Sequence, residues 1–384
     1  MRVFFAAVVA AVAAPGAAHA APNCAGAVPS APAGLPSPVA VTTVCGVYTV
    51  SAAGTVSVGP ARTLQAPPTD RTFLGRRGRH VVLISDGRII WQSQRSFPRS
   101  LAVGNVALTL PDIAFSFQGG RRLWVARLGR AEQPVALNES PYAWTANRGL
   151  LTTRWIGPGD LSSLLVRTED GSHPRLIAAR ARMLTFDDAT QTLWFFSRGA
   201  LVRSDGRTTT TIAKLSALGM GRNTYFELLD SGLIAVAGEN RIAILRRDGS
   251  VFAASDLSQP RGVGTALELT GRPVVAADTV AFAVGEVDGG GLTPVEHVFV
   301  LHAGDTKATE VLRTRVEDNP CGRYAGLEWN GDWLLYTDGE RATAIDTTDA
   351  GRSVDLSAFL LGLPGVGLDE EGSLSGLGDV AWAG

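Results

Sequence analysis

A short phrase that occurs three times constrains this chain of 384 residues more than any other feature. The copies begin at Leu165, Leu201 and Ile244, and each has two apolar residues, an arginine, one or two polar residues and then Asp-Gly. A β-strand that runs into Asp-Gly is typical of half a β-hairpin, because the primed two-residue turns need positive φ at both central positions. The copies lie roughly forty residues apart, which is the period of a β-propeller blade.

Further strand–turn–strand patterns occur at similar spacing along the chain. Clear cases span His80–Trp91, Ile113–Ala126 and Trp333–Ile345, each around a Gly-containing turn. The sequence therefore predicts an all-β fold, a β-propeller of about seven blades (six to eight), each a four-stranded antiparallel sheet. An array of β-sandwich domains is the alternative, although it would need linkers that are not evident after Pro68.

The C-terminal region predicts how the propeller would close. Val380–Trp382 is strand-like, and we expect it to complete a blade begun at the other terminus. Asp355–Leu361 is the one helical candidate, because Gly362 and Pro364 follow it as stop signals. Leu101–Leu110 is interpreted as a pair of strands around Gly104 and Asn105.

The first twenty residues have the pattern of a secretory signal peptide. Arg2 precedes an apolar run over residues 3–14, and Ala18-His19-Ala20 fits the cleavage rule. The run is too short to span a bilayer, which disfavours the alternative of a retained anchor. We therefore expect a signal peptide over 1–20, a flexible Ala- and Pro-rich leader over 21–38, and a single propeller domain over 39–384. Cleavage near Ala20 would place the protein outside the cytoplasm, secreted or in the periplasm or cell envelope, without stable membrane insertion.

Three cysteines would share that oxidising compartment: Cys24, Cys45 and Cys321. The local Cys24–Cys45 disulfide is the preferred pairing. A disulfide from either of them to Cys321 is the alternative, and it would connect the first blade to the last.

The net charge of -1 argues against bulk electrostatic binding to nucleic acid or anionic lipid, although it leaves room for a local patch. We therefore expect no nucleic-acid partner, and instead an unidentified protein or glycan.

The sequence contains no pattern that specifies catalysis. Gly372–Gly376 has its serines in the wrong places for a nucleophile elbow. His297 and His302 are five residues apart, so on one strand they would point to opposite faces and could not share a metal. No catalytic residue, cofactor or metal ligand is predicted. A non-catalytic binding or scaffold module is favoured, and the alternative is an extracellular enzyme that acts on a glycan or peptide in the central propeller cleft.

The aromatic residues separate into two groups. Trp91, Trp124, Trp155, Trp194 and Trp333 fall on expected strands, where packing between blades would bury them. Tyr142, Trp144 and Trp329 fall in expected loops, and these three are the candidates for a ligand-stacking surface.

Two segments resemble the repeats of TolB-like propellers. Asp170-Gly171-Ser172-His173-Pro174-Arg175-Leu176 is similar to the phrase that ends a blade in that family, and Pro111-Asp112-Ile113-Ala114-Phe115-Ser116 is similar to its opening phrase. The resemblance covers about a quarter of the chain. It implies a propeller with a solvent channel and loop-borne binding surfaces, but it implies no particular function.

Overall fold

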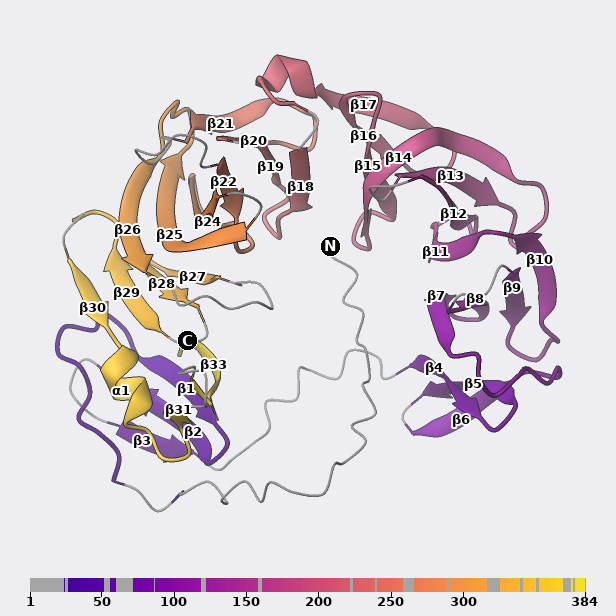
Figure 1. Cartoon of the computed structure of the whole chain (residues 1–384). Coiled ribbons are helices and arrows are strands. Elements are labelled where there is room, and N and C mark those ends of the chain that lie inside the picture. The colour runs from indigo at the N-terminus through magenta and orange to yellow at the C-terminus, as the bar shows by residue number, and fades with distance from the viewer. Residues whose placement is uncertain are drawn as a thin grey trace. The chain divides into compact units, whose positions relative to one another are not determined.

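The protein is described from a computed structural model (Figure 1). The structure describes residues 24, 27–51, 56–59, 72–85, 87–118, 122–157, 161–221, 224–238, 240–257, 266–288, 291–315, 325–338, 341–349, 352–368, 374–375 and 377–383. The chain forms two compact units. Unit 1 contains Ala66–Gly219, and unit 2 combines Phe4–Gln65 with Met220–Gly384.

Unit 1 consists of antiparallel meanders that follow the chain order. Its sheets have the strand orders β4-β5-β6, β10-β9-β8-β7 and β11 through β17. The strands are β4 (Phe73–Arg77), β5 (His80–Ser85), β6 (Arg88–Gln92), β7 (Val103–Thr109), β8 (Asp112–Phe117), β9 (Arg122–Arg127), β10 (Gln133–Leu137), β11 (Ser140–Trp144), β12 (Leu150–Gly157), β13 (Leu161–Arg167), β14 (Arg175–Asp187), β15 (Thr192–Ser197), β16 (Ala200–Ser204) and β17 (Thr209–Lys214), followed by the 3₁₀ turn η1 (Leu215–Leu218). Strand β14 pairs with β13 through its first half and with β15 through its second half, so it takes part in two meanders.

Unit 2 repeats this meander design. Its sheets have the orders β3-β2-β1-β33, β18-β19-β20-β21, β22-β24-β25-β26 with β23 on β24, β27-β28-β29-β30 and β31-β32. The elements are β1 (Val39–Thr43), β2 (Gly46–Val50), β3 (Val56–Gly59), β18 (Thr224–Leu228), β19 (Ile234–Gly238), β20 (Arg241–Leu245), β21 (Val251–Asp256), β22 (Ala266–Leu269), β23 (Val274–Ala276), β24 (Thr279–Asp288), β25 (Gly291–His302), β26 (Thr309–Arg315), β27 (Gly326–Asn330), β28 (Trp333–Thr337), β29 (Ala342–Asp346), β30 (Ser353–Asp355), α1 (Ser357–Leu361), β31 (Gly367–Leu368), β32 (Leu374–Ser375) and β33 (Leu377–Trp382).

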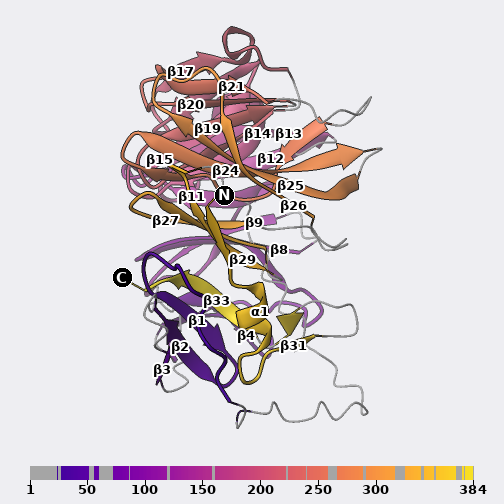
Figure 2. The same cartoon turned by 90° about the vertical axis from the view of Figure 1, so that its left-hand side faces the viewer.

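The strand order at the chain ends confirms the predicted closure. β33 pairs antiparallel with β1, with Val39 opposite Trp382 and Val41 opposite Val380 (Figures 1 and 2). Repeated four-stranded antiparallel meanders, one of them completed by the last strand, are the blades of a β-propeller, so the predicted fold class is confirmed. The number of blades and the single-domain arrangement of 39–384 stay predictions.

The three Asp-Gly turns each join the third strand of a meander to the fourth, but they are not primed turns. In the Asp-Gly pairs only the glycines have positive φ, with values of 78° at Gly171, 85° at Gly206 and 91° at Gly249, and the first turn has a further positive φ of 46° at His173. In the first and third copies, the amide of the residue after the strand donates to a carbonyl four residues on, as in Arg246 N to Ser250 O at 2.9 Å. In the second and third turns one left-handed residue is therefore enough, and glycine supplies it without a Cβ penalty.

Most of the predicted local structure is confirmed, including helix α1 within Asp355–Leu361. Leu101–Leu110 contains one strand, β7, rather than a pair, because Gly104 and Asn105 lie at a shift in the register with β8 instead of in a turn. The expectation that Trp155 is buried between blades is wrong. It lies near the end of β12, where the strand extends past its buried section, and it is 71% exposed.

The disulfide Cys24–Cys45 is present, with the two Cα atoms 5.3 Å apart, as preferred from the sequence. It fastens the segment before β1 to the β1–β2 turn. Cys321 lies outside the described residues, and so does the predicted signal peptide over 1–20. Residues 21–23, 25 and 26 of the predicted leader lie outside them as well. No helix within the described ranges is long and apolar enough to cross a membrane.

Candidate ligand-binding cavity

Unit 1 contains a cavity of about 480 Å³ between the β7–β10 sheet and the turn that joins β13 to β14. Its lining combines a small apolar floor with charged and hydroxyl groups: Asp112, Val125, Ala126, Arg127, Arg130, Ala131, Gln133, Thr168, Glu169, Asp170, Ser172 and His173. Concave sites in which a few polar groups converge are typical of ligand-binding pockets. The two segments that resemble TolB-like repeats, around Asp112 and Asp170, both contribute to this lining.

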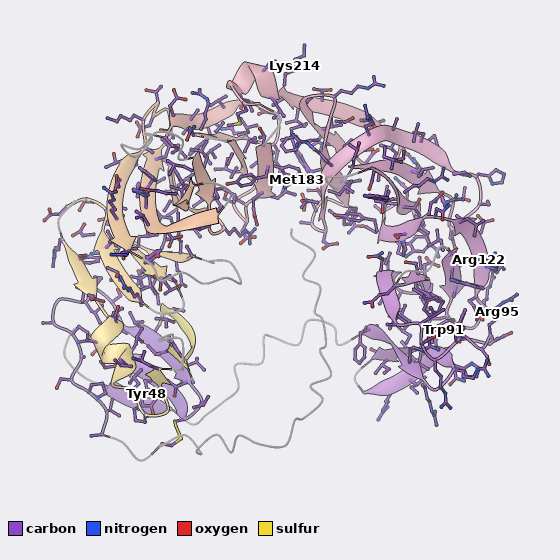
Figure 3. The ribbon with its side chains drawn as sticks, in the orientation of Figure 1. Tyr48, Trp91, Arg95, Arg122, Met183 and Lys214 are labelled. Carbon is purple, nitrogen blue, oxygen red and sulfur yellow. A yellow bond between two sulfur atoms is a disulfide. The ribbon has the colours of Figure 1, made fainter. Side chains whose placement is uncertain are left out.

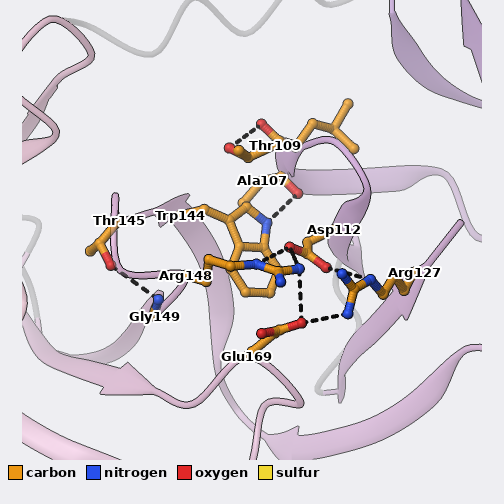
Figure 4. A network of polar contacts seen from close by, with 10 residues as sticks. Ala107, Thr109, Asp112, Arg127, Trp144, Thr145, Arg148, Gly149 and Glu169 are labelled. Atoms are coloured by element: carbon orange, nitrogen blue, oxygen red, sulfur yellow. Dashed lines mark hydrogen bonds and ion pairs between the residues drawn. The ribbon is translucent and has the colours of Figure 1, made fainter.

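Three of the lining residues, Asp112, Arg127 and Glu169, are joined by Arg148 into a closed ring of charged side chains (Figure 4). Asp112 accepts from Arg148 at 2.5 Å and lies 3.6 Å from Arg127. Glu169 binds the same two guanidinium groups, at 2.6 Å to Arg127 and 2.8 Å to Arg148. The hydrogen bond to Asp112 raises the pKa of Arg148. Two cations and two anions therefore hold one another in place, and this part of the wall is electrically balanced.

The strand register places these groups. Asp112 begins β8 and lies directly opposite Arg127, the last residue of β9. Arg148 comes from the β11–β12 turn, where its φ is 59°, and Glu169 comes from the β13–β14 turn. The ring therefore joins two consecutive meanders, β7–β10 and β11–β14.

Gly171 lets the β13–β14 turn approach the β7–β10 sheet closely. Its φ of 78° disfavours any L side chain, and a Cβ there would lie 2.7 Å from the Val135 side chain. A larger residue at this position would push the turn away from the cavity wall that Val125 and Val135 support.

Asp170, Ser172 and His173 form a contact series in the same turn. Ser172 Oγ lies 2.7 Å from Asp170 Oδ1 and 2.6 Å from His173 Nδ1. Hydrogen bonds from Thr168 and Ser172 lower the pKa of Asp170 to about 2. Its carboxylate is therefore ionised and accepts a hydrogen bond from the Ser172 hydroxyl. His173 must then donate to Ser172 rather than remove its proton. The series fits a hydrogen-bonding surface and not an activated serine nucleophile, which needs an adjacent base.

A second ion-pair network lies in the interior of unit 1. The Glu139 side chain is 0% exposed, and it binds Arg167 through two hydrogen bonds of 2.8 and 3.0 Å. Arg154 and Thr152 add bonds of 2.8 and 2.9 Å. Burial alone would raise the pKa of Glu139, but these bonds outweigh it and lower the pKa. Arg167 also donates to the Gly171 carbonyl at 2.8 Å, which anchors the turn that carries the cavity residues.

The three aromatic candidates from the sequence lie on strands, so their expected loop positions are wrong. Trp144 ends β11, is 2% exposed and donates its indole N–H to Ala107 O at 3.2 Å. Tyr142 is half-buried and donates to Leu184 O at 2.6 Å, and its burial raises its pKa. Trp329 on β27 donates to Val274 O at 3.3 Å. None of the three lines the cavity, and a ligand-stacking role for them stays a prediction.

The charged residues of the ring were not predicted from the sequence, although their positions along the chain carry a signal. Arg127 ends a strand, and Arg148 and Glu169 lie within turns, where propeller loops collect. However, two of their contacts connect residues 36 and 42 positions apart, the Arg148–Asp112 and Arg127–Glu169 bonds. Within the part of the chain that the structure describes, no group of three or more His, Cys, Asp or Glu residues could hold a metal ion.

Comparisons with known proteins identify no family for this chain. No family model matches it, and no curated protein matches it. Among solved structures, it is similar to one titled as the eukaryotic initiation factor, with a TM-score of 0.42 and 10% identity over 90% of this chain and 98% of that one. It is also similar to Kluyveromyces lactis Hsv2, with a TM-score of 0.38 and 10% identity over 82% and 96%. A third is a catalytically inactive virginiamycin B lyase from Staphylococcus aureus with quinupristin, with a TM-score of 0.32 and 13% identity over 81% and 95%. Likeness at this level carries no argument about function.

Proposed function

We propose that the protein is a secreted or cell-envelope β-propeller that acts as a non-catalytic binding or scaffold module, with the unit 1 cavity as its binding site. Export after cleavage near Ala20 and a TolB-like character of the repeats are parts of this proposal. The Cys24–Cys45 disulfide supports it, because disulfides persist in oxidising compartments.

The observation that carries the proposal is the ion-paired ring in the cavity wall. Arg127, Arg148, Asp112 and Glu169 are fixed before any ligand arrives, so binding would not have to order them. Beyond the ring, Arg130, His173 and the Thr168 and Ser172 hydroxyls offer donors and acceptors within one concave surface. A polar segment of a protein or a glycan fits this chemistry.

Affinity capture with residues 21–384 tests the proposal. The bait is exposed to cell-envelope extract and secreted material, and the bound proteins and glycans are identified by mass spectrometry. Ala131→Phe, which fills the cavity, is compared with Ala189→Phe, which adds the same ring to the exposed β14–β15 turn. We expect one reproducibly enriched macromolecule with the wild type and Ala189→Phe, and its loss with Ala131→Phe.

An enzyme that acts on a glycan or peptide is the alternative function, and the Asp170–Ser172–His173 contacts are the observation that bears on it. A general acid needs a raised pKa, whereas the pKa of Asp170 is lowered to about 2. An empty capture together with turnover of a glycan or peptide pool would favour the enzyme. Equal capture by both phenylalanine variants would exclude the cavity as the binding site.

A further inference from the structure

The small net charge of the chain conceals a large separation of charge. Residues 66–219, which form unit 1, contain 21 Arg and Lys against 11 Asp and Glu, a formal charge of +10. Residues 220–384 contain 12 Arg and Lys against 25 Asp and Glu, a formal charge of -13. Charge asymmetry of this size between two parts of a chain indicates an electrostatic role for one of them.

Many carboxylates of unit 1 are already engaged within the unit. Asp112, Glu139 and Glu169 bind arginines, and Glu132 accepts two backbone amides. Asp170 and Asp205 cap turns through Ser172 N and Arg207 N. Few carboxylates of the unit therefore remain to pair with its excess arginines.

Four of these arginines lie in or beside the loop from Ser93 to Leu101, and we call them the arginine patch: Arg79, Arg95, Arg99 and Arg122. All four are exposed. Phe97 N donates to Arg79 O at 2.7 Å, which brings the loop against Arg79. Arg95 lies over the Trp124 ring at 5.6 Å, and Trp124 is two residues from Arg122 on the same face of β9. Figure 3 places Arg95 and Arg122 on the same side of unit 1 as Trp91.

The backbone that carries the patch is fixed. Glu132 is 3% exposed and accepts from Gln94 N at 2.9 Å and Arg95 N at 2.6 Å. Arg76 donates to Phe97 O at 3.1 Å, and the Phe97 ring lies 5.1 Å from Trp124 in the core. Within the described ranges, no carboxylate contacts the guanidinium groups of the patch. A rigid loop that presents unpaired arginines would lose little conformational entropy on binding.

We propose that the arginine patch binds an anionic polysaccharide, a sugar chain that bears carboxylate or sulfate groups. Guanidinium groups match both anions with paired hydrogen bonds. The loop exposes Gln94, Ser96 and Ser100 between its arginines, and these side chains suit sugar hydroxyls. The choice of a polysaccharide rests on the proposed location outside the cytoplasm, but the patch is separate from the cavity.

Two other polyanions fit the patch less well. Single-stranded nucleic acids stack on exposed aromatic rings, whereas Trp124 is 8% exposed and Arg95 covers it. Anionic membranes are bound by basic segments that also insert apolar side chains, whereas the loop buries Phe97 and packs Leu101 against the core. Nucleic acid and membrane are therefore outcomes of the test.

The test measures binding of residues 21–384 to heparin and polygalacturonate, with neutral dextran, double-stranded DNA and vesicles of phosphatidylcholine and phosphatidylserine for comparison. The variant Arg79→Glu, Arg99→Glu, Arg122→Glu is matched by Arg180→Glu, Arg207→Glu, Lys214→Glu, which changes the charge of unit 1 equally at exposed positions of β14–β17. We expect the patch variant to weaken binding to the two anionic polysaccharides roughly tenfold or more, and the matched variant by less than about threefold, at moderate salt. Wild-type affinity should fall as the salt concentration rises.

Equal losses in the two variants would overturn the patch as the site, and so would an absence of polysaccharide binding. Tighter binding of DNA or vesicles, with the same dependence on the patch, would overturn the polysaccharide. If charge reversal prevents folding, the variant Arg79→Gln, Arg99→Gln, Arg122→Gln replaces it, because this variant removes the three charges without reversing them. The cavity variant Ala131→Phe should bind polysaccharide as the wild type does, so failure of the cavity proposal and failure of the patch proposal give different results.

Discussion

The two ion-pair networks of unit 1 use the same residue types in opposite ways. Around Glu139, the Arg167 side chain is 7% exposed and the carboxylate is 0% exposed, so the charges are removed from water and satisfied by one another. Around Asp112, only the carboxylate is buried, whereas Arg127, Arg148 and Glu169 are 34 to 41% exposed. The interior network therefore anchors the β13–β14 turn through Arg167, whereas the cavity network leaves charged groups exposed to water, where the proposed ligand would contact them.

The largest expected effect comes from breaking the interior network. Arg167→Met should lower the free energy of unfolding by about 3–5 kcal/mol, because it leaves the Glu139 carboxylate buried without its main partner. Arg154→Met removes a partner that is 47% exposed and should cost less than about 1 kcal/mol. Urea unfolding followed by tryptophan fluorescence measures both. Similar losses in the two variants would contradict the distinction between the networks.

The acid response of the interior network should be the next largest. The pKa of Glu139 is lower in the folded protein than in the unfolded chain, so its stabilising contribution is complete above the unfolded value of about 4.3 and is lost as the pH falls through the folded value. The difference in unfolding free energy between the wild type and Glu139→Gln should therefore shrink as the pH is lowered from about 6 to 3. A difference that stays constant over this range would show that the Glu139 charge is not what stabilises the fold.

The smallest effect on stability is expected in the cavity network. Glu169→Gln should change the free energy of unfolding by less than about 1 kcal/mol, because its partners are half-exposed and are screened by water. The same variant should weaken capture of the cavity ligand, since it removes one anion from the fixed ring. Thermal melting and the capture experiment measure the two effects. A large loss of stability with unchanged capture would reverse the roles assigned to the two networks.

The sequence predicts the fold well where the information is local. Strand alternation and Gly-containing turns predict the meanders that contain β5 and β6, β28 and β29, and the three repeated phrases. The pairing of Val380–Trp382 with β1 follows from the need to complete a blade. The predicted primed turn is wrong because one left-handed residue, Gly249, is enough in the turn that the Arg246 N to Ser250 O bond closes.

The candidate site could not be predicted in the same way, because its residues come together through the packing of meanders. Arg148 and Asp112 are in hydrogen-bond contact although they lie 36 residues apart. Trp144 is similar: its neighbours along the chain indicate a loop, but Ala107 on another sheet accepts its indole N–H and buries it. This information lies only in how one sheet packs against the next.

The pairing of β1 with β33 has a consequence for the order in which the chain can fold. Every strand of unit 1 comes from one continuous stretch, so its contacts can form as soon as that stretch has been synthesised. The first sheet of unit 2 contains both ends of the chain, and it lacks its fourth strand until residues 377–382 emerge. Pairing over such a sequence separation is slow because the loop must close first. We therefore expect unit 1 to fold while β1 still has an open edge, because its partner β33 is synthesised last. That open edge would be the part of the chain most exposed to aggregation during biogenesis.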